Sequence, residues 1–428
     1  MTTTTTTTQL PNVMKRIGLD ALAARPRGAV DAATLVAAKA IVDDVQAGGE
    51  AALRAHAERL GDVLPGAPLV LAKSVLEAAW RGLAESERAC LERTVARVRS
   101  FAEAQRSALR DLVVGIPGGR AGHTVAPIER AGCYAPGGRF PLPSSVIMTV
   151  VTARASGVDT VWVASPRPAA VTLAAAHIAG ADGFLAVGGA QAVAALAFGA
   201  GPVPACDIVV GPGNRWVTAA KQLVAGQVAI DMLAGPSELV VLADASADPA
   251  TIAADLLAQA EHDPDAVPTL VTTDLALADA VEAALAEQLA TLPTAATARA
   301  ALANGAIVLT ADLDDAIEAC QRLAPEHLEL HLAEPWLAVP RLHHYGALFI
   351  GGLAAEVLGD YGAGPNHVLP TGGTARFSGG LSVLTFLRVR TWLELTDRAA
   401  AAELVHDAAD LARMEGLEAH ARAAERRC

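Results

Sequence analysis

The sequence predicts an α/β protein with two parallel sheets and helices on both faces of each. Short runs rich in β-branched residues recur along the chain, and alanine-rich stretches with helical spacing separate them. Such alternation is typical of parallel strands joined by helices. The length of 428 residues is enough for two or three domains.

The N-terminal part predicts helices. Residues 30–60 and 73–112 show helical spacing with charged faces, and the turn sequence GIPGGR at 115–120 follows them. The threonine-rich start of the chain has no such pattern and predicts a disordered tail.

Two series of strands follow. The first consists of TVWVASP (160–166), GFLAVGG (183–189) and DIVVGPG (207–213). The second consists of ELVVLAD (238–244), TLVTTD (269–274), AIVLT (306–310) and GALFIG (346–351), with helices expected at about 249–262, 275–291 and 312–322. The two series indicate two α/β units.

The C-terminal part differs from both series. From Leu381 the chain leads into a charged amphipathic helix, expected around 397–427, with no sheet of its own to join. We expect this helix to pack on a neighbouring element or on a partner subunit.

Composition and charge exclude several classes of function. A net charge of −13 repels nucleic acid, and no basic stripe interleaved with aromatic residues offsets it locally. The apolar stretch at 184–206 is broken by glycines and prolines, which argues against a membrane span. Five scattered cysteines without a CxxC pair favour a reducing compartment, so we expect a cytoplasmic protein that binds a small substrate or cofactor.

The stretch QAEHDPD contains the first candidate site. Asp248 and Pro249 predict the start of a helix, so Gln259 and His262 lie in its last turn, on one face. Side chains at positions i and i+3 can bind one metal ion. Alternatively, His262 caps free carbonyls at the helix end and Gln259 is a solvated polar residue.

The stretch PEHLEL contains the second candidate site. Glu326 and His327 are adjacent where a strand begins, and neighbouring strand residues point to opposite faces unless the backbone bends. At a strand end both could serve one cavity and carry out proton transfer and water activation. The alternative is an exposed carboxylate beside a half-buried histidine.

Two further segments combine polar side chains with glycine. The loop at 359–373 holds Asp360, Asn366 and His367 and has too few large apolar residues to build a core, which favours a ligand site. Near the C-terminus, Glu415 and His420 lie in the predicted terminal helix. The alternative for this pair is a solvated helix face.

Glycine-rich turns occur in the first series at 133–145 and 211–216, and neither matches GxGxxG. The second turn follows a strand directly, and α/β sheets bind ligands at the carboxyl ends of their strands. A plain tight turn is the alternative. Cys133 has no His or Lys neighbour that would lower the pKa of its thiol, so we expect a packing residue.

Taken together and in this order, these segments resemble the histidinol dehydrogenase family over nearly the whole chain. The resemblance rests on IERAGCYAPGG, GGAQAVAALAFG, GPGNRWVTAAK, IDMLAGPSE, LLAQAEHDPD, LAPEHLEL, GDYGAGPNHVLPT, SGGLSVLTFL and EGLEAH.

The resemblance implies oxidation of L-histidinol to L-histidine with two NAD⁺, through an aldehyde that stays bound. It implies one Zn²⁺ per subunit, held by Gln259, His262, Asp360 and His420. By the same resemblance, Glu326 activates water and His327 removes the alcohol proton and assists the second hydride step.

The resemblance also implies the binding residues and the assembly. Besides the metal ligands, substrate contacts fall on Ser237, His327 and Glu415, with Ser144, Glu356 and His367 as weaker candidates. NAD⁺ contacts fall on Tyr134, Gln191 and Asn214. The family's terminal segment crosses to the other subunit, which implies a homodimer with shared sites.

The division into domains follows the same resemblance. We expect a tail and helix at 1–28, a larger Rossmann-like domain made of 29–128 and 238–380, an incomplete Rossmann-like NAD-binding domain at 129–237, and a helical segment at 381–428. Small helical segments at both ends would cross to the partner subunit.

Three residues depart from the family's usual pattern: Arg139, Phe140 and Pro365. An added guanidinium near the substrate could bind an anionic group. This leaves open a dehydrogenase of the same fold that oxidises another polar alcohol, such as a sulfonated diol. A non-catalytic metal-binding or nucleotide-binding module is a further alternative, although such a module would be expected to lose Glu326 or His327.

Overall fold

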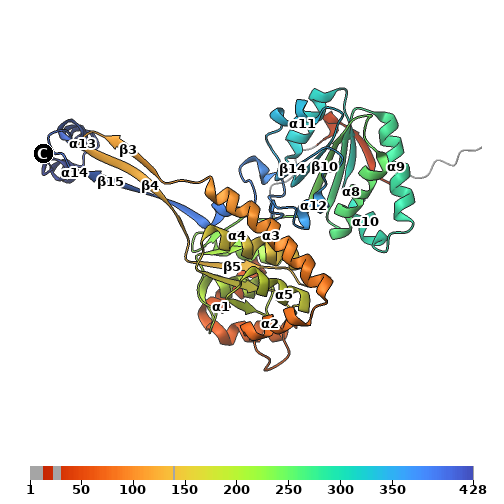
Figure 1. Ribbon diagram of the computed structural model, residues 1–428, viewed down its shortest axis with the longest axis horizontal. Coiled ribbons are helices and arrows are strands. Elements are labelled where there is room, and N and C mark those ends of the chain that lie inside the picture. The colour runs from red at the N-terminus through yellow and green to blue at the C-terminus, as the bar shows by residue number, and fades with distance from the viewer. Residues whose placement is uncertain (1–12, 23–29, 138–139, 428) are drawn as a thin grey trace, which may run out of the picture.

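The computed structural model describes residues 13–22, 30–137 and 140–427. These residues form two α/β units and a long arm that projects away from them (Figure 1). We name the units after their central strands, the β10 unit and the β5 unit.

The β10 unit contains a six-stranded parallel sheet with the order β1-β12-β11-β10-β13-β14. The strands are β1 (Lys15–Gly18), β10 (Glu238–Ala243), β11 (Val267–Thr272), β12 (Ala306–Leu309), β13 (His327–His331) and β14 (Ala347–Ile350). One face is covered by α8 (Pro249–His262), α9 (Leu275–Leu289) and α10 (Ala295–Leu302), and the other by α11 (Leu313–Leu323). The short helix α12 (Glu356–Asp360) follows β14.

The β5 unit contains a second six-stranded sheet with the order β2-β7-β6-β5-β8-β9, in which only the edge pair β2 and β7 is antiparallel. The strands are β2 (Val70–Leu71), β5 (Arg130–Tyr134), β6 (Thr160–Ala164), β7 (Gly183–Leu185), β8 (Ile208–Val210) and β9 (Ala229–Ile230). The helices are α1 (Ala32–Arg59), α2 (Lys73–Gly82), α3 (Glu85–Ser107), α4 (Pro143–Ser156), α5 (Ala170–Ala179), α6 (Gly189–Phe198) and α7 (Arg215–Val224).

Helices cover both faces of this second sheet as well. The helices α2, α3, α4 and α5 share one core with the sheet, and α1, α6 and α7 share the other. The predicted fold class, two parallel sheets with helices on both faces, is therefore confirmed.

The place of the early helices differs from the expected division. Residues 29–128 were expected to join 238–380, yet α1, α2 and α3 pack on helices of the β5 unit, and β2 pairs with β7. The apolar faces of these helices identify them as helices but do not specify which sheet they cover.

The arm was not expected as a sheet. It is built from three antiparallel strands in the order β15-β4-β3, namely β3 (Leu112–Ile116), β4 (Gly119–Pro127) and β15 (Leu387–Leu395). The helices α13 (Ala402–Met414) and α14 (Glu418–Glu425) form its tip (Figure 1). Gly416, with φ of +78°, separates them, so the single helix expected at 397–427 is two helices.

The N-terminal segment also differs from its prediction. Within residues 13–22, Lys15–Gly18 is a strand that pairs with β12, and a 3₁₀ turn, Leu19–Ala21, follows it in place of a helix. The rest of the predicted tail lies outside the described residues. Further 3₁₀ turns are Pro335–Leu337, Val339–Arg341, Thr374–Arg376 and Val383–Phe386. Among the described residues, no helix is long and apolar enough to cross a membrane.

Candidate active site

Glu326 and His327 lie together at the amino ends of β10 and β13. Glu326 directly precedes β13, and its Oε2 accepts the backbone N–H of Glu238 at 2.9 Å. His327 opens the strand, and its Nδ1 donates to the carbonyl of Glu238 at 3.0 Å. The imidazole Nδ1 is 3.7 Å from the Glu326 carboxylate. The strand end therefore allows both side chains to turn toward one place, as the strand-end hypothesis required.

The bond from His327 Nδ1 fixes the orientation of the imidazole. Because Nδ1 donates its proton to a carbonyl, Nε2 is the atom that can accept a proton from a ligand. Nε2 lies 3.7 Å from Asp360 Oδ1 and has no hydrogen-bond partner among the described residues. The alternative of a half-buried histidine beside an exposed carboxylate is wrong, because both residues are buried.

Gln259 and His262 occupy the end of α8, as predicted. Asp248 caps the helix through the N–H of Thr251 at 3.0 Å, and Pro249 is its first residue. Gln259 is 0% exposed, and neither atom of its amide has a hydrogen-bond partner within the described chain, so the alternative of a solvated residue is wrong. Buried amides are seldom left unpaired, which favours a ligand there.

Three side chains converge beside this amide. The possible ligand atoms of His262, Glu356 and Asp360 all lie within 4.8 Å of one another. Glu356 and Asp360 are the first and last residues of α12, which brings them to the exposed His262 at the end of α8. Imidazole and carboxylate groups at this spacing suit a divalent cation such as Zn²⁺. Sequence reasoning had considered Glu356 only as a weaker substrate contact.

The loop after α12 joins the two units. His367 Nδ1 donates to the carbonyl of Asp360 at 2.9 Å. Asn366 points elsewhere, because its Nδ2 donates to the carbonyl of Met148 at 2.9 Å and to Oγ1 of Thr152 at 3.1 Å, both on α4. The loop thus positions Asp360 and His367, while the side chain of Asn366 attaches the loop to α4 of the β5 unit.

A cavity of about 660 Å³ runs between the units beside this loop. His327, Asp360 and His367 line it, together with Phe101 of α3 and Pro365. The volume fits a small polar substrate. Two other expected contacts, Ser237 just before β10 and Ser144 on α4, are half-buried.

Burial and neighbouring charges shift the pKa values in the cleft. Burial raises the pKa of Glu326 to about 8. Burial alone would lower the pKa of His327, but the carboxylates of Glu326, Glu356 and Asp360 outweigh it and raise that pKa to about 10. Burial also raises the pKa of Glu356 well above its ordinary value. The cluster therefore retains protons near neutral pH, which is typical of sites that move protons.

Asp360 and His367 are shifted in the opposite direction. Burial tends to raise the pKa of Asp360, but the neighbouring imidazoles of His327, His367 and His262 outweigh it and lower that pKa below its ordinary value. Burial lowers the pKa of His367. Asp360 is thus ionised and available as a ligand.

The residues expected to bind NAD⁺ lie in the β5 unit, at the carboxyl edge of its sheet. Tyr134 is the last residue of β5, and its hydroxyl accepts the N–H of Gly189 at 3.2 Å. Gln191 lies in the first turn of α6, after β7. Asn214 follows β8 and caps α7 by accepting the N–H of Trp216 at 3.0 Å. All three are therefore at the edge where α/β sheets usually bind ligands.

Two features of this edge were missed or only partly foreseen. At Gly211 φ is +119°, and an added Cβ would lie 2.0 Å from the carbonyl oxygen of Tyr134, so this turn requires glycine. Asp62 accepts the amide of Gln191 at 2.9 Å and the N–H of Gly188 at 3.0 Å. No sequence signal distinguishes Asp62, which comes from a turn far away in the chain.

Glu415 and His420 lie on the arm. His420 belongs to α14 and Glu415 directly follows α13, and both are exposed. The arm carries them away from the cleft of their own chain (Figure 1). The single chain therefore does not bring the fourth expected metal ligand to the other three.

Comparison with known proteins decides the family. The sequence model of histidinol dehydrogenase matches residues 25–428. The chain belongs to the histidinol dehydrogenase family. It is 48% identical over 396 residues to the histidinol dehydrogenase of Thermus thermophilus, covering 91% of this chain and 93% of that protein. To the histidinol dehydrogenase of Parasynechococcus marenigrum it is 44% identical over 394 residues, covering 90% and 89%.

A solved structure agrees with this membership. The crystal structure of histidinol dehydrogenase from Elizabethkingia anophelis matches with a TM-score of 0.90 at 28% identity, over 98% of this chain and 99% of that one. The fold of the histidinol dehydrogenase family, including the arm, therefore extends through nearly the whole chain.

Proposed function

We propose that this chain oxidises L-histidinol to L-histidine, the last step of histidine biosynthesis. Two NAD⁺ each accept one hydride, and the intermediate aldehyde stays bound. The observation that carries the proposal is the pairing of Glu326 with His327 at the cleft, beside Asp360. Oxidation of an alcohol to an acid needs a base for the alcohol, an activated water for the aldehyde and an anchor for the intermediate.

His327 acts in both hydride steps. Its Nε2 faces the cleft, where it accepts the hydroxyl proton as the first hydride leaves the alcohol carbon. His327 then releases this proton to solvent. Glu326 takes a proton from water as the water oxygen adds to the aldehyde, which gives the anion of the hydrated aldehyde. His327 accepts the remaining hydroxyl proton of this hydrate as the second hydride leaves, and the carboxylate forms. The two hydrides carry four electrons to two NAD⁺, and three protons are released in all, which balances the oxidation.

One Zn²⁺ would be held by four side chains, namely Gln259, His262 and Asp360 of one subunit and His420 of the partner subunit. The buried, unpartnered amide of Gln259 and the convergence of His262 with Asp360 support this ligand set. When bound, the metal anchors and polarises the substrate and lowers the pKa of nearby acids by its positive charge. The contacts to the substrate would be completed by Ser237, Glu356 and His367 of the same subunit and by Glu415 of the partner subunit.

NAD⁺ would bind at the carboxyl edge of the β5 sheet. Tyr134, Gln191 and Asn214 offer polar groups there, and the glycine turn at Gly211 keeps the edge open to a ligand. Cys133 takes no part, because burial raises the pKa of its thiol to about 12 and leaves it without nucleophilic thiolate.

The exposed apolar side chains of the arm support a homodimer. Val113, Val389, Leu393, Leu411 and Met414 are each more than half exposed. Among the described residues of the tip, the buried hydrophobic cluster consists of three alanines, with a fourth packed against it. An isolated arm of this kind is too apolar on the outside and too small inside to be stable alone. Exchange of arms would bury these side chains and bring Glu415 and His420 to the partner's cleft.

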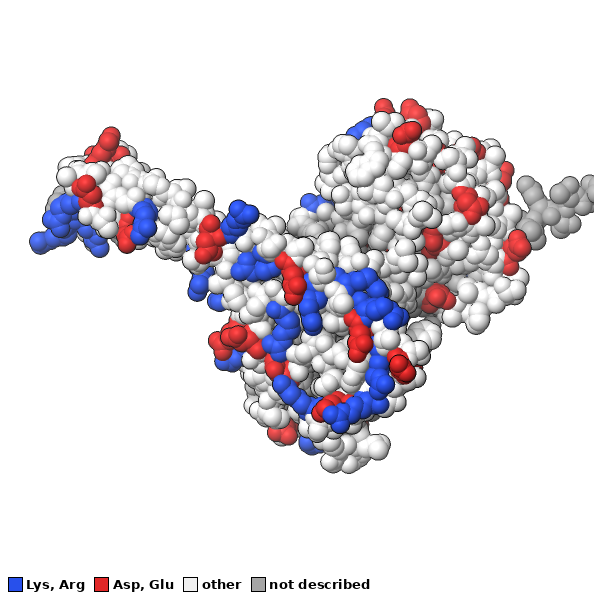
Figure 2. All heavy atoms as spheres, in the orientation of Figure 1, with Lys and Arg blue, Asp and Glu red and all other residues white. Residues whose placement is uncertain are grey.

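Charge on the visible face fits a small-molecule enzyme. Basic and acidic side chains alternate over the β5 unit, and the face of the β10 unit is mostly uncharged (Figure 2). Such mixing offers no continuous positive track for nucleic acid. The described cysteines are free thiols, which supports a cytoplasmic location.

A dehydrogenase of the same fold for another polar alcohol is the second candidate. Pro365 lines the cleft, so this departure from the family pattern bears on the choice of substrate, whereas Phe140 is 51% exposed and does not line the cleft. The third, Arg139, lies outside the described residues. Glu415, an acidic group suited to an imidazole-bearing substrate, favours histidinol.

The test is the stoichiometry of the reaction. We expect purified protein to form two NADH per histidinol and to stop when a chelator removes the metal. Preference for a sulfonated diol over histidinol would favour the second candidate. Binding of zinc or NAD⁺ without turnover of any alcohol would indicate a non-catalytic module.

A further inference from the structure

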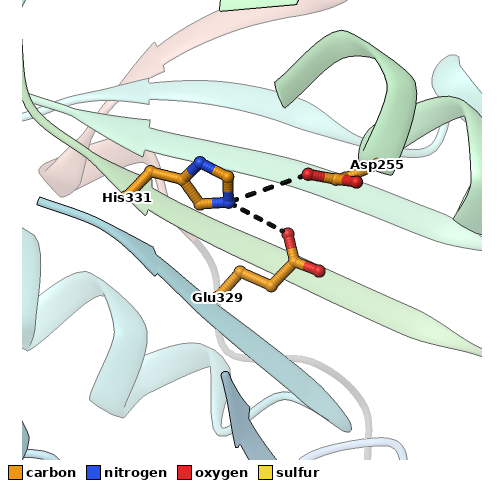
Figure 3. A group of neighbouring side chains, drawn as sticks. All are labelled: Asp255, Glu329 and His331. Atoms are coloured by element: carbon orange, nitrogen blue, oxygen red, sulfur yellow. Dashed lines mark ion pairs between the residues drawn. The ribbon is translucent and has the colours of Figure 1, made fainter. Parts of the chain in front are cut away.

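A buried cluster of ionisable side chains in the β10 unit is satisfied within that unit. It consists of Asp255 on α8 and of Glu329 and His331 on β13 (Figure 3). Burial and the neighbouring Glu329 carboxylate raise the pKa of Asp255 to about 7. The two carboxylates can therefore share one proton, which accounts for their oxygens that lack another partner within the described residues.

A buried ion pair in the β5 unit instead contacts one turn of the backbone. Lys221 in α7 pairs with Asp231, which directly follows β9. Their side chains are 3% and 0% exposed. Lys221 Nζ donates to the carbonyl of Gly211 at 3.0 Å, and Asp231 Oδ2 accepts the N–H of Gly211 at 2.7 Å. The pair thus binds both backbone groups of one residue.

Stability alone does not explain this ion pair. Moving two charges out of water is costly, and a buried pair often stabilises a fold no more than apolar side chains of the same volume would. The surrounding core is apolar, because Val217, Ala220 and Val224 of the same helix pack in it. The geometry that the pair imposes on its backbone partners is therefore the better explanation.

The turn that the pair holds belongs to the proposed NAD⁺ site. Gly211 directly follows β8 and lies against the carbonyl of Tyr134, at the end of β5. Three residues later, Asn214 is the N-cap of α7. Glycine has wide conformational freedom, so this turn needs contacts from outside to keep one form. The ion pair supplies them between Tyr134 and Asn214.

We propose that Lys221 and Asp231 are positioning residues for NAD⁺. The ion pair fixes the turn at Gly211, and the turn places Tyr134 and Asn214 for the cofactor. Both charged side chains are buried and their charges cancel, so they act through the backbone and do not touch the cofactor. A turn that is ordered before binding loses less entropy when the cofactor binds. The inference rests on the proposed function, because it takes the carboxyl edge of the β5 sheet as the NAD⁺ site.

The test compares the affinity for NAD⁺ with stability in the zinc-loaded protein. Lys221→Met keeps a long unbranched side chain but removes its charge and its donor. We expect it to raise the Kd for NAD⁺ about tenfold, as is typical when the groups behind a binding residue are lost. Isothermal titration calorimetry measures this Kd without turnover. The KM for histidinol at saturating NAD⁺ should stay unchanged, whereas a merely structural role would lower the melting temperature without separating the two ligands.

Arg154→Met is the matched control. Arg154 also pairs with an aspartate, Asp182, and donates to backbone carbonyls, those of Asp159 at 2.7 Å and Gly180 at 2.9 Å. These contacts lie at the amino edge of the same sheet, before β6 and β7. We expect this variant to melt at a lower temperature and to keep the Kd for NAD⁺ of the wild type.

Asp231→Asn reaches the same turn from the other side. It keeps the size of the side chain and one acceptor, so we expect a smaller rise in the Kd for NAD⁺, and this variant decides if Lys221→Met does not fold. An unchanged Kd in the folded variants, or an equal rise in Arg154→Met, would overturn the inference and leave the proposed NAD⁺ site intact. Absence of NAD⁺ binding by the wild type would contradict the proposed function, and the inference would fall with it.

Discussion

The two six-stranded sheets share one strand order but bury different side chains. In each sheet three successive strands lie side by side in sequence order, β10 to β12 or β5 to β7. The next two strands of the chain lie on the other side of β10 or β5, and the N-terminal strand, β1 or β2, lies beyond β12 or β7. The buried polar residues of the β5 unit are hydroxyls, the amide of Gln191, and Lys221, which forms an ion pair with Asp231. The β10 unit buries carboxylates and imidazoles around β13, namely Glu326, His327, Glu329, His331 and Glu356.

This difference shows that topology alone does not locate the chemistry. Buried ionisable groups cost free energy unless they are paired or bind ions. The β10 unit keeps many of them, which is expected of a unit that transfers protons and binds metal. The β5 unit has a conventional apolar interior, which suits a platform that holds a cofactor.

The edges used by the two sheets also differ. The candidate NAD⁺ residues follow the general rule and lie at the carboxyl ends of β5, β7 and β8. Glu326 and His327 lie at the opposite, amino end of β13. A search restricted to carboxyl edges would find the cofactor site and miss the catalytic pair.

Removal of the Glu326 carboxylate should have the largest effect on the reaction. We expect Glu326→Gln to slow aldehyde oxidation roughly 100- to 10,000-fold, since the base that activates water is lost. Formation of the aldehyde should be less affected, so rapid mixing should show one NADH per site followed by a stall.

Glu282→Gln is the matched control for this change. Glu282 is also a buried carboxylate of the β10 unit, but it pairs with Arg16 far from the cleft. We expect it to lower the free energy of unfolding and leave kcat unchanged. Equal loss of kcat in both variants would contradict a special role for Glu326.

Exchange of the arms can be tested by complementation. His262→Ala and His420→Ala each remove one expected metal ligand, and we expect each homodimer to lose activity by roughly 100-fold or more. In a mixed dimer one site carries both defects and the other carries neither. Random assembly of the two chains should therefore restore about a quarter of wild-type activity. Absence of any recovery, with dimers shown by sedimentation, would contradict a site shared between subunits.

A smaller effect is expected at the cofactor edge of the β5 unit. Asn214→Ala should raise the KM for NAD⁺ about tenfold, or ~1.4 kcal/mol, and should also remove the cap of α7. Asn214→Ser keeps a cap while changing the polar contact. If the KM rises equally in both variants and only the alanine variant melts at lower temperature, the contact to NAD⁺ and the cap of α7 are two separate roles of Asn214. An unchanged KM in both would place NAD⁺ elsewhere.

The pH dependence of stability, which does not involve turnover, gives the last test. Burial raises the pKa of Glu326 from an ordinary value of 4.5 to about 8, so between these values the unfolded chain has lost a proton that the folded chain retains. The free energy of unfolding of the chelator-treated protein should therefore fall as pH rises through this window, by at most about 1.4 kcal/mol per pH unit from this residue. Denaturant unfolding should show a shallower fall in Glu326→Gln. An identical slope would contradict the raised pKa.

Much of the fold could be predicted from local patterns. The strands around β6, β7, β8, β10, β11, β12 and β14 match the expected β-branched runs, and Asp248 with Pro249 marks the start of α8. These features depend on neighbouring residues, which a single sequence displays. The assignment of α1, α2 and α3 to a sheet depends on distant contacts, so the sequence left it undetermined.

The arm was missed although part of its signal was present. Residues 387–395, LRVRTWLEL, alternate in a way that is typical of a strand, but the charged helical pattern that follows them is stronger and hides this signal. The turn at 115–120, predicted to follow a helix, instead joins the strands β3 and β4. β3 pairs with β4, but the other partner of β4 is β15, more than 250 residues away. Pairing over such a separation leaves little trace in a local pattern.

The side chain of Asn366 has a consequence for turnover. It ties the loop that carries Asp360 and His367 to α4, so the two units cannot rotate apart without breaking two hydrogen bonds worth about 1 kcal/mol each. If NAD⁺ binds at the carboxyl edge of the β5 sheet as proposed, exchange of NADH for NAD⁺ need not break this contact. The intermediate aldehyde would then stay in the cleft between the two hydride transfers.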